Sequence, residues 1–154
     1  MAIRNIVKKG DDILTKRCKE VKEINERILD LLDDMRDTLY NSGNGVGLAA
    51  PQVGILKRIV VIDVGDGLIE LINPVIIEQE GEQDHVEGCL SIPGVFGKVK
   101  RPARVVAEYT DREGNKSRIE GTELLAVCLS HEIDHLDGIL FDQKVYEFVD
   151  LENE

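Results

Sequence analysis

The segment 122–137 places apolar residues around most of the circumference of a helix. These residues are Leu124, Leu125, Val127, Cys128, Leu129, Ile133 and Leu136. A helix that is apolar on most of its faces is normally buried. Thr122 and Glu123 suit its first turn, and Gly138 suits its end. The rest of the chain is therefore expected to fold around this helix.

A second, amphipathic helix is predicted at 25–41. Apolar residues recur there at helical spacing, and charged residues fill the opposite face. The apolar residues are Ile24, Ile28, Leu31, Leu32, Met35 and Leu39. The Ser-Gly-Asn-Gly sequence at 42–45 should end this helix.

Short runs rich in β-branched residues predict strands in the middle of the chain. They lie at 59–64, 68–72, 104–110 and 116–119. Turn sequences at 65–67 and 111–115 would join neighbouring strands as hairpins. Asn73 and Pro74 interrupt or end the second strand, which can resume at 75–77. The sequence thus predicts an α+β fold, with mostly antiparallel strands around the buried helix and a separate N-terminal helix.

Composition narrows the possible functions. The chain of 154 residues has no internal repeat, which predicts one domain spanning 1–154. Its formal charge of −11 disfavours binding to nucleic acid or to anionic membranes, whose phosphates it would repel. Neither a membrane-spanning run nor a secretory signal is recognisable, so we expect a cytoplasmic protein. An odd, sparse set of three cysteines argues against a disulfide framework.

The sequence His-Glu-Ile-Asp-His at 131–135 carries the clearest chemistry. On a helix, His131 and His135 point the same way and can hold one metal ion. Glu132 is rotated away from them, but it can reach a water molecule bound to that ion. The ion lowers the pKa of the water, and the glutamate accepts its proton. The alternative is that both histidines are hydrogen-bonded core residues.

A catalytic metal site needs a third protein ligand, and Cys89 is the best candidate. Cys128 shares the helix but lies about 10 Å along the axis from His135, so it is expected to line the interior as a small apolar residue. His85 is a rival ligand, although its polar neighbours predict a surface position. Cys18 has no neighbouring ligand type and is expected to be structural. A thiolate with two imidazoles suits zinc or ferrous iron better than magnesium or calcium.

Three separated segments of the sequence stand out: Gly-Val-Gly-Leu-Ala-Ala-Pro-Gln at 45–52, Glu-Gly-Cys-Leu-Ser at 87–91 and the His-Glu-Ile-Asp-His segment. Together they resemble the signature motifs of the peptide deformylase family. Their order and spacing match the family, and the resemblance covers nearly the whole chain. It implies hydrolysis of the formyl group from N-formylmethionine at the N-terminus of newly made polypeptides, with release of formate.

The same resemblance implies roles for individual residues. Cys89, His131 and His135 would bind one divalent metal ion, most commonly ferrous iron, with zinc, nickel or cobalt possible in a purified sample. Glu132 would be the general acid and base. The residues that would stabilise the oxyanion are Gln52 and, through its backbone N–H, Leu90.

Substrate contacts follow from the resemblance as well. Gly45 and Gly47 would hold the substrate backbone like an added strand. The pocket for the methionine side chain would be formed by Val46, Leu124, Val127 and Cys128. Glu87 and Arg101 would form a supporting ion pair.

The chain departs from the family pattern in two places. Ser130 stands where the family usually has glutamine. The C-terminal sequence at 146–154 is short and acidic, whereas some members end in a basic helix that docks on the ribosome. We therefore expect N-formylmethionyl polypeptides as partners and at most transient contact with the ribosome.

Two other functions are compatible with parts of the pattern. A zinc endopeptidase would share the helical motif, but it gives no role to Gln52 or to the segment 87–91. A structural metal-binding module would need a fourth ligand, and no further cysteine or histidine is well placed for it.

Overall fold

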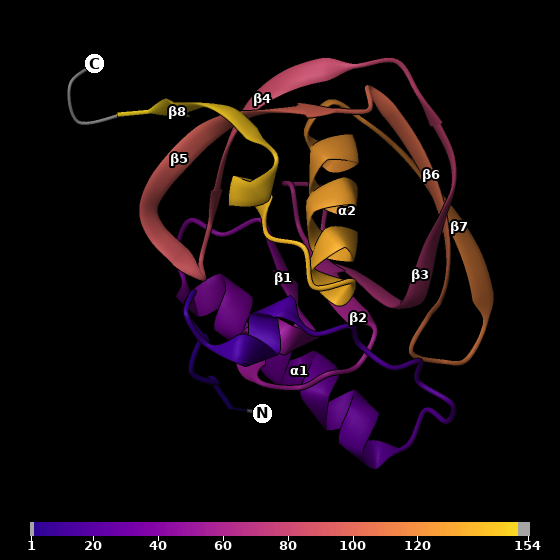
Figure 1. The fold of residues 1–154 in the computed structure, drawn as a ribbon. Coiled ribbons are helices and arrows are strands. Elements are labelled where there is room, and N and C mark those ends of the chain that lie inside the picture. Colours follow the sequence, from indigo (N-terminus) through magenta and orange to yellow (C-terminus); the bar gives the residue numbers. More distant parts are fainter. Residues whose placement is uncertain (1, 151–154) are drawn as a thin grey trace.

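The computed structural model describes residues 2–150, and one helix lies at its centre (Figure 1). This helix, α2 (Glu123–Leu136), is buried along most of its length from Ala126 onwards. Thr122 occupies the N-cap position but makes no side-chain capping bond. Gly138 adopts φ +76°, a left-handed conformation that suits glycine at the end of a helix. The prediction of a buried helix is confirmed.

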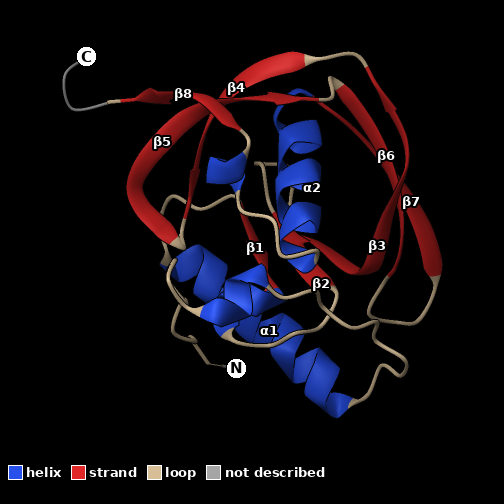
Figure 2. Ribbon diagram, viewed as in Figure 1, coloured by secondary structure: helices blue, strands red, loops and turns tan. Residues whose placement is uncertain are grey.

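Two antiparallel sheets surround α2, as Figure 2 shows. The five-stranded sheet has the order β1-β2-β3-β6-β7, and the three-stranded sheet has the order β4-β5-β8. The strands of the larger sheet are β1 (Gly47–Ala49), β2 (Ile59–Ile62), β3 (Ile69–Glu80), β6 (Arg104–Thr110) and β7 (Lys116–Thr122). Those of the smaller sheet are β4 (Gln83–Cys89), β5 (Ile92–Arg101) and β8 (Val145–Val149). Short 3₁₀ turns lie at Asp12–Thr15, Ala50–Val53 and Phe141–Gln143. The predicted α+β class is confirmed.

The N-terminal helix α1 (Glu26–Asn41) begins at Asn25, whose side chain accepts a hydrogen bond from the Ile28 N–H. Its apolar face packs on one face of β2, through Ile59 and Val61. The alternate residues Val60 and Ile62 belong to the cluster that contains α2. Because successive residues of a strand point to opposite faces, the continuous apolar run of β2 is explained by burial between the two helices.

Strand β3 is longer than the sequence predicted. It continues through Asn73 and Pro74, where the pairing with β6 shifts register between Ile72 and Val75. Asn73 has φ +52°, which asparagine tolerates better than most residues. Its side chain donates to the Val21 carbonyl oxygen and accepts from the Val21 N–H, both at 2.8 Å. The Asn-Pro sequence therefore marks a bulge that anchors the N-terminal segment, and it does not end the strand.

The sequence analysis did not identify β1 or any strand of the smaller sheet. These strands carry glycine, proline or charged residues, which weaken strand signals in a single sequence. Strand β8 occupies part of the acidic C-terminal segment, and residues 151–154 lie outside the described residues. Within residues 2–150, no helix is long and apolar enough to cross a membrane.

We predict that Asn73→Ala lowers the free energy of unfolding by about 1–3 kcal/mol. The substitution removes both hydrogen bonds to Val21 and places alanine at a positive φ. Chemical denaturation checks this, with Gln79→Ala, at an exposed position of the same strand, as the control. Equal unfolding midpoints for the two variants would contradict the anchoring role of Asn73.

Candidate active site

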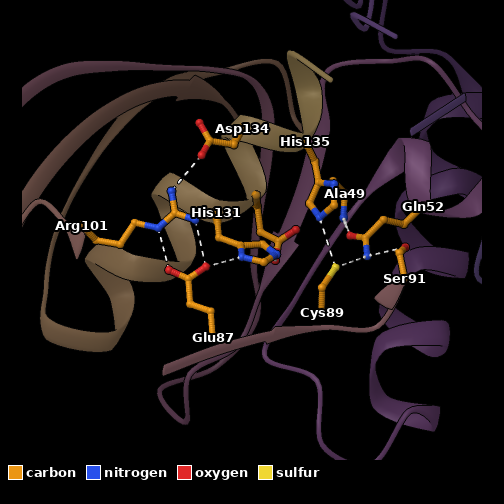
Figure 3. A network of polar contacts seen from close by, with 10 residues as sticks. Ala49, Gln52, Glu87, Cys89, Ser91, Arg101, His131, Asp134 and His135 are labelled. Atoms are coloured by element: carbon orange, nitrogen blue, oxygen red, sulfur yellow. Dashed lines mark hydrogen bonds and ion pairs between the residues drawn. The ribbon is translucent and has the colours of Figure 1, made fainter. Parts of the chain in front are cut away.

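Three side chains that could hold a metal ion converge beside α2. Cys89 ends β4, while His131 and His135 lie on consecutive turns of α2 (Figure 3). Their ligand atoms all lie within 4.8 Å of one another. The Cys89 Sγ atom is 3.4 Å from His135 Nε2. The structure thus brings together the three residues that the sequence predicted as ligands.

The donor set and its electrostatics fit a divalent cation. Burial lowers the pKa of His131. This effect is outweighed by three neighbouring groups, the carboxylates of Glu132 and Glu87 and the thiol of Cys89, which raise the pKa to about 10. Burial and the charge on His131 hold the pKa of His135 well below its usual value, so this imidazole is neutral. The site therefore favours positive charge while providing a neutral nitrogen ligand, which suits zinc or iron.

Glu87 orients His131 from the side opposite the other ligands. The His131 Nδ1–H donates to Glu87 Oε1 at 2.7 Å, which leaves Nε2 as the nitrogen that can bind a metal. Arg101 binds both oxygens of Glu87, at 2.6 and 2.8 Å, and also Asp134 at 2.8 Å. Burial raises the pKa of Glu87, but bonds from Arg101 and His131 lower it to about 2. The expected ion pair between Glu87 and Arg101 is present.

Glu132 is buried next to this cluster without a complete set of partners. The residue is only 4% exposed, and its Oε1 atom has no hydrogen-bond partner among residues 2–150. Burial raises the pKa of Glu132 to about 7, against the lowering effect of a charged His131. Gly47 makes room for it, since a Cβ atom there would lie 2.6 Å from Glu132 Oε2. A buried carboxyl group with one free oxygen and such a pKa is suited to proton transfer.

Gln52 is held in a fixed orientation. Its Oε1 accepts a hydrogen bond from the Ala49 N–H at 2.9 Å. Its Nε2 is therefore turned toward the cluster, where it donates to Ser91 Oγ at 3.1 Å and lies 3.5 Å from Cys89 Sγ (Figure 3). The sequence pointed to Gln52, but it gave no role to Ser91, which is fully buried and supports the amide.

A cavity of about 550 Å³ opens onto these groups. Its lining includes Glu132, Gln52, Leu90 and His131. The residues predicted to contact substrate also line it, namely Gly45, Val46, Gly47, Leu124, Val127 and Cys128. Burial raises the pKa of the Cys128 thiol to about 12, so it remains protonated and lines the wall as a weakly polar group.

Three residues remain to be placed, and one of them, His85, differs from its expected surroundings. His85 was expected at the surface, but it is half-buried and lines the same cavity, because it faces inward on β4. Ser130 is buried on α2, and its hydroxyl has no hydrogen-bond partner in the part of the chain that the structure describes. Cys18 is buried away from the site, and burial raises its pKa to about 11, as expected for a structural thiol.

Comparison with known proteins agrees with this geometry. The family model of polypeptide deformylase matches residues 3–149. The chain belongs to this family. It is 69% identical to the peptide deformylase of Acetivibrio thermocellus over 150 residues, which cover 97% of this chain and 88% of that protein.

Solved structures of deformylases share the fold. The peptide deformylase from Thermotoga maritima superposes with a TM-score of 0.91 at 37% identity, covering 94% of this chain and 99% of that chain. The peptide deformylase from Legionella pneumophila gives 0.90 at 43% identity, covering 94% and 86%. Members of the family are metallohydrolases that remove the formyl group from the N-terminal formylmethionine of nascent polypeptides. The resemblance stated from the sequence motifs is confirmed.

We predict that Glu87→Gln weakens metal binding about 10- to 100-fold, because the carboxylate that orients His131 is lost. Competition with a chelator measures this affinity. Asp84→Asn is the matched control, since Asp84 is an exposed carboxylate on the same strand. Unchanged affinity in Glu87→Gln would show that Glu87 does not support the metal site.

Proposed function

We propose that this chain carries out the family reaction with Cys89, His131, His135, Glu132 and Gln52 as its active centre. The reaction is hydrolysis of the formyl group of N-formylmethionine at the start of newly made polypeptides, and it releases formate. The observation that carries the proposal is the convergence of three potential ligands with a buried glutamate whose Oε1 has no partner among the described residues.

Cys89, His131 and His135 would hold one divalent ion, which we propose to be ferrous iron. Zinc, nickel or cobalt would fit the same ligands in a purified sample. When bound, the ion acts as a Lewis acid that makes a coordinated water easier to deprotonate and polarises a carbonyl oxygen. Cys89 and His131 line the cavity, so water and substrate would reach an ion held there, as a catalytic site requires.

Glu132 moves the protons. Its carboxylate accepts a proton as water adds to the formyl carbon, and it delivers that proton to the amine nitrogen as the carbon–nitrogen bond breaks. Because Oε1 has no protein partner among the described residues, this oxygen is available to water or to the amine. A positive ion held nearby would lower the pKa of Glu132 and keep it ready to accept a proton.

Gln52 and the backbone N–H of Leu90 would stabilise the negative charge that develops on the formyl oxygen. Two features support this role for Gln52. Its amide is pre-oriented by Ala49 and Ser91, and it lies beside Cys89. Donors fixed in advance cost no reorganisation during the reaction, which makes them effective in a buried site.

The walls of the cavity would place the substrate. The backbone at Gly45 and Gly47 would pair with the peptide as an added strand, and Val46, Leu124, Val127 and Cys128 would surround the methionine side chain. Gly45 is itself closely packed, because a Cβ atom there would lie 2.8 Å from Ser42 Oγ and 2.9 Å from Leu90 Cδ1.

We place the protein in the cytoplasm, where newly made polypeptides emerge. We propose that its contact with the ribosome is transient, because the C-terminal sequence is acidic and its described part forms β8 instead of a basic helix.

Formate release from a formyl-methionyl tripeptide tests the proposal, using protein prepared without oxygen and loaded with ferrous iron. We predict that Glu132→Gln reduces turnover by about 10²- to 10⁴-fold while the metal content is unchanged. Glu123→Gln, at an exposed position of the same helix, serves as the control.

Three outcomes would contradict the proposal. The wild-type protein could release no formate although it is folded and fully loaded with metal. Glu132→Gln could retain normal turnover, which would remove Glu132 from the mechanism. Cleavage of internal bonds in unformylated peptides would indicate an endopeptidase instead.

A further inference from the structure

Two side-chain hydrogen bonds join strand β4 to helix α2. Gln83 Nε2 donates to the Glu123 carbonyl oxygen at 3.0 Å, and four residues later Glu87 accepts from His131. Four residues of strand span about 13 Å, and the eight residues from Glu123 to His131 span about 12 Å of helix. His85 lies midway between these two contacts and on the same face of β4. It therefore lies between these two contacts to the helix, and it lines the same cavity as Val127.

This position places His85 in the wall of the cavity that Leu124, Val127 and Cys128 also line. The three helix residues are apolar or carry a protonated thiol. His85 is thus a hydrogen-bonding group next to the part of the cavity wall that Leu124, Val127 and Cys128 form. Its Nδ1 atom is buried and has no hydrogen-bond partner among the described residues.

The two carboxylates that flank His85 on β4, Asp84 and Glu87, are committed elsewhere. Asp84 alternates to the outer face of β4, where it accepts a hydrogen bond from Tyr146 and lies 3.5 Å from Lys100 Nζ. Glu87 is held by Arg101 and His131. With no acceptor at Nδ1, the tautomer that carries the proton on Nε2 avoids a buried unpaired N–H. That tautomer presents an Nε2–H donor to whatever occupies the pocket.

An apolar pocket rejects a side chain with a polar end, because the polar atom loses its water without replacement. A single donor reverses this preference for side chains that end in a hydrogen-bond acceptor. The thioether of methionine is a weak acceptor. Methionine sulfoxide has the same chain length and adds an oxygen that makes the side chain polar.

We propose that His85 is a specificity-determining residue of the first-residue pocket, which allows the enzyme to deformylate peptides that begin with formyl-methionine sulfoxide. This inference rests on the proposed deformylase function, and it widens the substrate class to chains whose first methionine has been oxidised. The hydrolysis itself is unchanged, since water adds to the formyl carbon and formate leaves the amine.

The test compares kcat/KM for two tripeptides that differ only in the first residue, formyl-methionine or formyl-methionine sulfoxide. The quantity of interest is the sulfoxide-to-methionine ratio within each variant. Because both substrates are assayed with the same enzyme preparation, the effect of partial misfolding or metal loss cancels in this ratio. We expect measurable sulfoxide turnover in the wild type and a ratio about tenfold lower in His85→Leu, which keeps the bulk but removes the donor.

Two further variants sharpen the result. His85→Gln retains an N–H donor and should keep the ratio within a few-fold of the wild type. Asp84→Asn changes the neighbouring outer-face residue and should leave the ratio unchanged. The role of His85 would be overturned if the wild type and His85→Leu gave the same sulfoxide-to-methionine ratio. It would also be overturned if the wild type did not turn over the sulfoxide substrate. Absence of turnover with formyl-methionine itself would instead overturn the proposed function.

Discussion

The ion pair between Glu87 and Arg101 allows a helix with ionisable residues to pass through an apolar interior. His131 needs a hydrogen-bond acceptor, and Glu87 provides it, but a buried carboxylate is itself costly unless it is paired. Arg101 pairs with Glu87 and also reaches Asp134, on the same helix. The network therefore joins β4, β5 and α2, and it fixes the ring of His131 at the same time.

The candidate active site lies where separate parts of the fold meet. The two histidines come from α2, Cys89 from the smaller sheet, and Gln52 from the turn that follows the first strand of the larger sheet. Each part is held by its own packing, since α1 and α2 bury opposite faces of β2 and the smaller sheet has its own apolar cluster. Such support from rigid elements is what a preorganised catalytic site requires.

The inner face of β4 would serve both the proposed chemistry and the proposed choice of substrate. Glu87 holds His131, Cys89 lies beside the two histidines, and His85 lines the cavity. Alternation along a strand explains why these odd-numbered residues share a face, while Asp84 points to the outer surface. A register shift in the pairing with β5 lies between Glu87 and Cys89, just before the strand ends at the site.

The sequence by itself determined the features that depend on local pattern. Helical periodicity located α1 and α2, and the spacing of His131, Glu132 and His135 predicted their chemistry, because positions on one helix fix the geometry of their side chains. Cys89 and Gln52 were found through their motifs, although nothing local shows that they approach the helix.

Other features were decided only by the tertiary structure. Strands β4, β5 and β8 carry weak local signals and form because they can pair with one another and cover α2. The continuity of β3 past Pro74 depends on the distant contact between Asn73 and Val21. From the sequence, His85 is predicted to be a surface residue in a polar segment. Only the position of β4 beside α2 places its side chain at the wall of the cavity. Contacts between residues far apart in the chain have no local signature, so the sequence could name the groups of this site but not their arrangement.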